Sequence, residues 1–100
     1  MKKEKSRIWD TAEHLKDEFI ISEYLNVAFE SGDFSQIKRA ISNVLKARNM
    51  SKLAKEINVN REGLYRSLSE KGNPNFSTVL KIMNNLGLKL HSSVANKNNK

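Results

Sequence analysis

The chain has 100 residues and a net charge of +7, with 38% hydrophobic and 29% charged residues, a composition typical of a soluble globular domain with one core. No apolar stretch approaches the ~20 residues of a membrane span, and without cysteine the chain has neither disulfides nor thiol chemistry. His14 and His91 stand far apart in the sequence without further ligands beside them, so we expect no metal site and no cofactor.

The two ends of the chain differ from the folded middle and from each other. Residues 1–9 are basic, lack apolar periodicity and are expected to be flexible. The basic residues up to Arg7 run directly into Ile8-Trp9-Asp10 without the apolar core of a secretory signal, which predicts a cytoplasmic protein. Residues 96–100 are polar and are expected to form a disordered tail.

Residues 10–33 are interpreted as an acidic helical extension. Asp10 or Thr11 caps a short helical turn, after which Phe19-Ile20-Ile21 interrupts the pattern. Ser22 then caps a helix whose apolar residues share one face and which Ser31-Gly32 ends.

Two short helices are predicted after a longer one in the domain that spans residues 34–95. Asp33 and Gln36 resemble a capping box that opens the longer helix, which ends near Asn49. Ser51 caps residues 52–57, Asn58 supplies a left-handed turn, and Asn60 caps residues 61–70. This succession predicts a helix-turn-helix unit, with the small Ala54 where the two short helices meet and with Ile57, Val59 and Leu64 beneath them.

A last helix and a strand complete the predicted fold. Ser77 caps the helix and Gly87 ends it, after a loop that contains the only proline. Leu88, Leu90 and Val94 alternate with other residues, which indicates a short strand. The expected fold is therefore all-α, with five helices, an N-terminal helical extension and a short C-terminal β-strand.

The second short helix carries groups that suit DNA recognition. Leu64 and Leu68 point into the core, while one arc of the helix presents Arg61, Glu62, Tyr65, Arg66 and Ser69. Arginine can bind guanine through two hydrogen bonds, glutamate can accept from cytosine, and tyrosine can contact a thymine methyl group or a phosphate.

The surroundings of this helix offer further contacts to the DNA backbone. Ser51 and Asn60 stand at helix N-termini that can present N–H groups to phosphate, and the flanking candidates are Lys52, Lys71, Asn73 and Asn75. Residues 34–100 carry thirteen positive charges against three negative ones, which favours a phosphate-rich partner. A helical bundle with an ordinary solvated face is the alternative.

The sequence resembles the antidote (antitoxin) proteins of HigA-like type II addiction modules, which have a Cro/C1-type helix-turn-helix. The resemblance covers about Trp9 to Leu90 and is carried by Trp9-Asp10, Tyr24-Leu25, Met50-Ser51-Lys52-Leu53-Ala54, Arg61-Glu62-Gly63-Leu64-Tyr65-Arg66 and Leu86-Gly87-Leu88. Two departures are Asn58, where many such units have glycine, and Ser67, where they have an aliphatic residue. Because Ser67 is not aliphatic, Leu68 is expected to pack in the core in its place.

The resemblance implies a protein without catalytic activity that neutralises a small basic RelE/HigB-like ribonuclease toxin and represses its own operon. Residues 10–33 carry one positive and seven negative charges among apolar side chains, a combination that suits a basic partner. The candidate toxin contacts are Asp10, Leu15, Asp17, Glu18, Phe19, Tyr24, Leu25 and Phe29. Alternatively, this segment only packs against the core.

The C-terminal strand suggests how the protein assembles. Its edges need a partner, which is either the same strand of a second copy or an edge strand of the toxin. A dimer would place two recognition helices one turn of DNA apart, about 34 Å, on a palindromic operator.

Two other functions remain compatible with the sequence. One is a stand-alone phage-type repressor without a toxin partner, and the other is a module that binds only proteins. An enzyme is disfavoured because no carboxylate pair, nucleophile with its base, or phosphate-binding loop occurs at a usable spacing.

Overall fold

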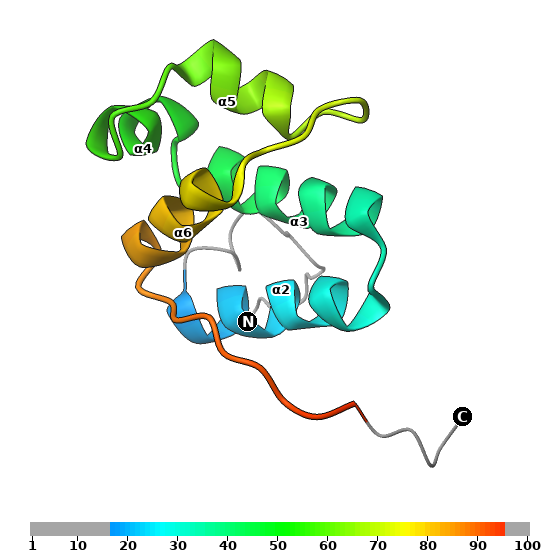
Figure 1. The fold of residues 1–100 in the computed structure, drawn as a ribbon. Helices are drawn as coiled ribbons and strands as arrows, with labels where there is room; N and C mark the ends of the chain where they lie inside the picture. The colour runs from blue at the N-terminus through cyan, green and yellow to red at the C-terminus, as the bar shows by residue number, and fades with distance from the viewer. Residues whose placement is uncertain (1–16, 96–100) are drawn as a thin grey trace, which may run out of the picture.

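A computed structural model describes residues 17–95, which form five helices (Figure 1). These are α2 (Glu18–Ser31), α3 (Phe34–Ala47), α4 (Met50–Glu56), α5 (Arg61–Ser67) and α6 (Phe76–Asn85). Helices α2 and α3 lie side by side and run in opposite directions, and α5 lies on the far side of α3 from α2 (Figure 1). None of these helices combines the length and the apolar character needed to cross a membrane.

Helix α2 begins earlier than the sequence pattern predicts. Asp17, not Ser22, is its N-cap, since the Asp17 carboxylate accepts hydrogen bonds from the N–H groups of Phe19 (2.8 Å) and Ile20 (3.3 Å). The run Phe19-Ile20-Ile21 continues the helix because its members divide between its two faces: Phe19 points to solvent and Ile21 is fully buried. The predicted end of α2 at Ser31-Gly32 is confirmed. Gly32 has a φ of 67° and donates its N–H to the Phe29 carbonyl.

The connection from α2 to α3 is short and closed by side-chain hydrogen bonds. The predicted cap is confirmed, because the Asp33 carboxylate accepts from the N–H groups of Ser35 (2.9 Å) and Gln36 (3.3 Å). The Asp33 N–H donates to the Ser31 hydroxyl at 3.1 Å, where a capping box would use the Gln36 side chain. This tight turn brings α3 back along α2.

The caps of α4 and α6 are asparagines, and the predicted serine caps are wrong. Asn49 accepts from the Lys52 N–H at 3.2 Å, and Asn75 accepts from the Thr78 N–H at 2.9 Å. Asn49 adopts the left-handed conformation (φ 69°), which lets the chain turn directly from α3 into α4. Each helix therefore starts sooner than expected, and the first residue of α4, Met50, is buried.

Helix α5 is shorter than predicted, ending at Ser67 instead of residue 70. The chain then turns back on the helix, with the Ser69 N–H donating to the Arg66 carbonyl and the Gly72 N–H donating to the Ser69 carbonyl. The predicted cap at its start is confirmed, because the Asn60 side chain accepts from the Gly63 N–H at 2.8 Å.

All five helices contribute to one hydrophobic core. Among its least exposed members are Ile21 and Leu25 of α2, Val44 and Leu45 of α3, and Ile82 and Met83 of α6. Leu53, Leu64 and Leu68 add the inner faces of α4 and α5. Because α2 supplies central members of this cluster, it packs into the same core as the four helices that follow.

The predicted C-terminal strand is not found in the single chain. Residues 88–95 have no regular secondary structure, and beyond Leu88 the chain extends away from the helices (Figure 1). Leu88 packs against the core and donates its N–H to the Met83 carbonyl at 2.9 Å, whereas Leu90 and Val94 are exposed. A strand needs a neighbour for its backbone groups, and the described part of one chain offers this segment none.

The glycine that closes the chain onto α5 should be sensitive to substitution. A Cβ atom on Gly72 would collide with the backbone carbonyl oxygens of Arg66 and Ser67. We expect Gly72→Ala to lower the free energy of unfolding by about 1–3 kcal/mol, as measured by urea denaturation.

Gly63→Ala is the matched control, because a Cβ there would meet atoms of Asn60 at the ordinary contact distances of 3.6 and 3.7 Å. Inside a helix, this exchange should raise the free energy of unfolding by up to about 1 kcal/mol. Wild-type stability in Gly72→Ala would contradict the close approach.

Candidate nucleic-acid interface

The turn between α4 and α5 holds the two helices in fixed relation. Asn58 has a φ of 62°, which confirms the predicted left-handed conformation. The next residue, Val59, donates its N–H to the Ala54 carbonyl at 2.9 Å, and Ala54 itself is buried. A larger side chain at Ala54 would push the helices apart.

The rotation of α5 about its own axis determines which side chains it exposes. Leu64 and Leu68 are buried, and the intervening Ser67 turns its hydroxyl back onto the Leu64 carbonyl at 2.8 Å. The helix therefore packs through Leu68, as the sequence suggests. Its opposite face carries the exposed side chains of Arg61, Glu62, Tyr65 and Arg66.

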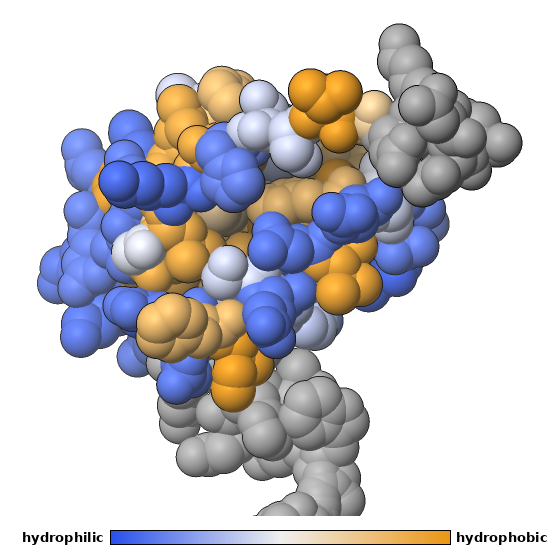
Figure 2. Space-filling model, turned by 90° about the horizontal axis from the view of Figure 1, so that it is seen from below, coloured by the Kyte–Doolittle hydropathy of each residue, from blue (hydrophilic) through white to orange (hydrophobic). Residues whose placement is uncertain are grey.

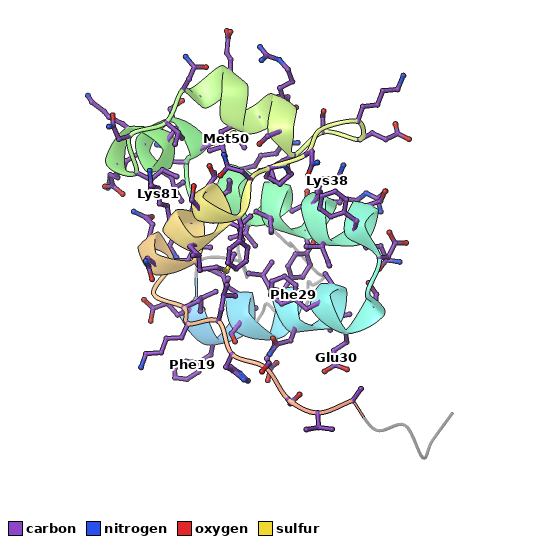
Figure 3. All side chains as sticks on the ribbon, viewed as in Figure 1. Phe19, Phe29, Glu30, Lys38, Met50 and Lys81 are labelled. Carbon is purple, nitrogen blue, oxygen red and sulfur yellow. The ribbon has the colours of Figure 1, made fainter. Side chains whose placement is uncertain are left out.

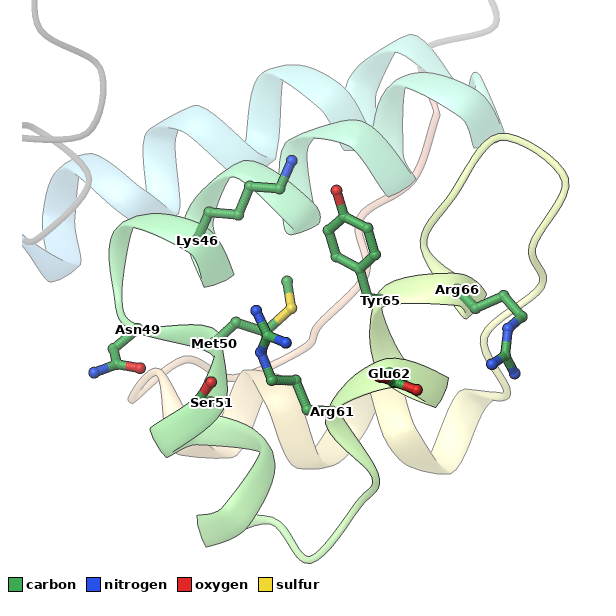
Figure 4. A pocket seen from close by; sticks show the side chains of 8 residues that line it. All are labelled: Lys46, Asn49, Met50, Ser51, Arg61, Glu62, Tyr65 and Arg66. Atoms are coloured by element: carbon green, nitrogen blue, oxygen red, sulfur yellow. The ribbon is translucent and has the colours of Figure 1, made fainter.

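These exposed side chains border a hollow between α5, the start of α4 and the end of α3 (Figure 4). Of the predicted DNA contacts, the hollow brings together Ser51, Arg61, Glu62, Tyr65 and Arg66. Three further lining residues, Lys46, Asn49 and Met50, were not predicted. Lys46 had a signal in the sequence, since it is a basic residue in the last turn before the two short helices.

Lys46 and Tyr65 connect α3 to α5 across this hollow. The Lys46 ammonium nitrogen lies 5.2 Å from the centre of the Tyr65 ring, a cation–π geometry. The Tyr65 hydroxyl points toward α3 in Figure 4. The aromatic ring therefore lies beside the exposed arginines, and the Tyr65 side chain is about half exposed.

A buried lysine fixes the chain that leaves α5. Lys38 of α3 is only 4% exposed, and its ammonium donates to the backbone carbonyls of Glu70 (2.9 Å) and Gly72 (2.7 Å). Its nitrogen also lies 4.6 Å from the centre of the Phe34 ring. Sequence reasoning missed this residue, although Lys38 stands seven positions before the core residue Leu45 and therefore on the same side of the helix.

The other predicted DNA contacts lie outside the hollow. Ser69 borders a second hollow, between α3 and the chain after α5. Asn60, Asn73 and Asn75 border a third, between α5 and α6, where Asn60 and Asn75 already serve as helix caps. Lys52 and Lys71 are exposed side chains beyond these hollows.

The candidate toxin contacts on α2 separate into exposed and buried groups. Asp17, Glu18 and Phe19 are exposed, and Phe19 points away from the core at 83% exposure (Figure 3). Leu25, by contrast, is 1% exposed in the core and cannot contact a partner. Asp10 and Leu15 lie outside the described residues.

Two aromatic candidates on α2 are held by the protein itself. Tyr24 accepts a hydrogen bond from the Asn43 side-chain amide at 2.9 Å, and Phe29 packs against the core between α2 and α3 (Figure 3). Val27, which was not predicted, is 72% exposed. Seen from the side of α2, the surface shows apolar side chains scattered among hydrophilic ones (Figure 2).

A protein-family profile described as "Probable addiction module antidote protein" matches residues 5–94 of this chain. The chain belongs to this family. The chain is also 42% identical over 85 residues to an uncharacterised protein of Haemophilus influenzae, an alignment that covers 85% of this chain and 88% of that relative. No solved structure matches. Membership in an antidote family indicates a non-enzymatic regulatory protein with a toxin as its partner.

Proposed function

We propose that this antidote represses its own operon by sequence-specific DNA binding and neutralises a RelE/HigB-like ribonuclease toxin. The observation that carries the DNA-binding half is the exposed row Arg61, Glu62, Tyr65 and Arg66 on a helix whose rotation is fixed from beneath. In this proposal, α4 and α5 act as a Cro/C1-type helix-turn-helix, with α5 in the major groove.

The side chains around the hollow have distinct roles in such a complex. Arg61 and Arg66 would each bind a guanine through O6 and N7, and Glu62 would accept a hydrogen bond from a cytosine amino group. Tyr65, held by Lys46, would contact a thymine methyl group or a phosphate. Lys52 and Lys71 would contact the DNA backbone, together with the polar groups of Ser51, Asn60, Ser69, Asn73 and Asn75.

A dimer would complete the DNA-binding unit. Leu90 and Val94 are exposed in a segment whose backbone extends away from the helices. Pairing of residues 88–94 with the same segment of a second copy would supply the missing neighbour and relate two α5 helices by a two-fold axis. A palindromic operator follows from that symmetry.

The acidic face of α2 supports the toxin-binding half of the proposal. From residue 17 to residue 37 the chain contains five carboxylates and neither lysine nor arginine. Phe19 protrudes among the acidic Asp17, Glu18 and Glu23, so a basic partner would meet both complementary charge and an apolar anchor. Val27 offers a second anchor two turns along the same helix.

The DNA-binding half is tested with fluorescence anisotropy on the operator and on a scrambled duplex. We expect Arg61→Ala and Arg66→Ala each to weaken operator binding by about 5- to 150-fold, corresponding to ~1–3 kcal/mol, and to relax base preference. Lys52→Ala should weaken both duplexes alike, because a phosphate contact carries no sequence information. If both arginine variants lose equal affinity for the two duplexes, the assignment of base contacts is wrong.

The toxin-binding half is tested by co-purification, which should recover a small basic protein, and by titration of that protein with the purified chain. We expect Phe19→Ala to raise the dissociation constant by at least about tenfold, as for a central apolar anchor. Phe76→Ala is the matched control, since it removes another exposed phenylalanine ring, 66% exposed against 83% for Phe19, from α6. Failure to recover any such protein would instead favour a stand-alone repressor, and equal effects of the two variants would remove α2 from the toxin surface.

A further inference from the structure

A second hollow continues the first one along α3. It lies between α3 and the chain that follows α5, and its lining includes Arg39, Ser42, Lys46, Ser69 and Glu70. Lys46 borders both hollows, which are therefore adjacent. The concave surface that begins at the start of α4 thus extends over the length of α3.

The polar side chains of α3 form a straight row on this surface. Ser35, Arg39, Ser42 and Lys46 follow one another at intervals of four, three and four residues, so they share one face of the helix. Arg39 and Lys46, both exposed, are separated by about 10 Å along the helix axis, given a rise of ~1.5 Å per residue. Two cations with a hydroxyl between them offer charge and hydrogen-bond donors but little apolar surface.

The net charge of this surface is positive. Arg39 and Lys46 face one carboxylate, that of Glu70. Lys38 adds a further positive charge in the floor of the hollow, although its hydrogen bonds go to the carbonyls of Glu70 and Gly72. A ligand that lies along the row therefore meets more positive than negative side chains.

We propose that this row, Arg39, Ser42 and Lys46, binds the phosphate backbone of the duplex where it runs past the bases contacted by α5. The inference rests on the proposed DNA-binding function and enlarges its footprint from the two short helices to α3. A nucleic-acid backbone is the ligand that fits, because the row joins the base-reading hollow at Lys46 and repeats cations along a line. The contacts would add affinity without sequence preference.

The salt dependence of DNA binding measures these contacts directly. Each neutralised phosphate contributes about −0.9 to the slope of log K against log salt concentration. We expect Arg39→Gln and Lys46→Gln each to make this slope shallower by roughly 0.9, for operator and scrambled duplexes alike. Arg39→Lys and Lys46→Arg should restore the wild-type slope, because both keep the positive charge.

Three further comparisons make the test specific. Lys89→Gln, a neutralised exposed lysine in the segment after α6, should leave the slope unchanged apart from a small general charge effect. The change in salt slope caused by Arg39→Gln should disappear on a duplex trimmed to the bases that α5 contacts. It should return when flanking base pairs are restored. The free energy of unfolding of each variant, from urea denaturation, identifies any loss caused by misfolding.

The salt-dependence experiment distinguishes phosphate contacts of α3 from sequence-specific DNA binding by α5. If the wild-type protein prefers no operator sequence, the proposed DNA-binding function fails. If the wild type binds its operator but folded Arg39→Gln and Lys46→Gln keep its slope, only the extension along α3 is overturned. Loss of affinity for the toxin instead of DNA in these variants would also overturn the extension along α3.

Discussion

The buried ammonium group of Lys38 is the interaction on which the position of α5 depends. A charge inside a protein is costly unless hydrogen bonds replace its water, and here the replacements are the carbonyls of Glu70 and Gly72. Those carbonyls are in place only when the chain after α5 folds back against α3. The lysine thus stabilises one path of residues 70–72, and other paths would leave its charge buried without partners.

Close packing transmits this constraint from the loop to the helix. Gly72 lies so near the carbonyls of Arg66 and Ser67 that a side chain would not fit, so the loop and the last turn of α5 are positioned together. On the exposed face of the same helix, the Lys46 ammonium nitrogen lies 5.2 Å from the centre of the Tyr65 ring. Helix α3 therefore positions α5 at two points, by one buried cation and one exposed cation.

The same helix separates the two proposed binding faces. In Figure 1, α5 lies on one side of α3 and α2 on the other. The exposed carboxylates of α2 and the exposed arginines of α5 consequently lie on opposite sides of the core. An antidote built in this way could hold a toxin on α2 while α5 occupies its operator, without competition between the two partners for one surface.

Much of the local structure could be predicted from single residues. Asp33 and Asn60 cap the helices expected of them, and Asn58 adopts its left-handed conformation, because each of these effects depends only on neighbouring backbone groups. The burial of Leu64 and Leu68 followed from helical periodicity. These residues sufficed to predict which face of α5 is exposed.

What could not be predicted depends on partners distant in the sequence or on competition between similar caps. Asn49 and Ser51 are both good capping residues, and the choice between them depends on the burial of Met50 against the rest of the core. The hydrogen bonds of Lys38 reach more than 30 positions along the chain. Helical periodicity placed Leu25 on the apolar face of α2, but whether that face meets a toxin or the core depended on the packing of α2 on α3, where Leu25 is buried.

The role of Lys38 can be measured by amide hydrogen exchange of Lys38→Met beside Lys81→Met, which replaces an exposed lysine of α6. Our account predicts that Lys38→Met lowers protection at Leu68, Ser69 and Gly72 by at least about tenfold, while Leu25 in α2 keeps its protection. Lys81→Met should match the wild type throughout. Unchanged protection after α5, or an equal loss in α2 and α5, would contradict the conclusion that this lysine holds α5 in place.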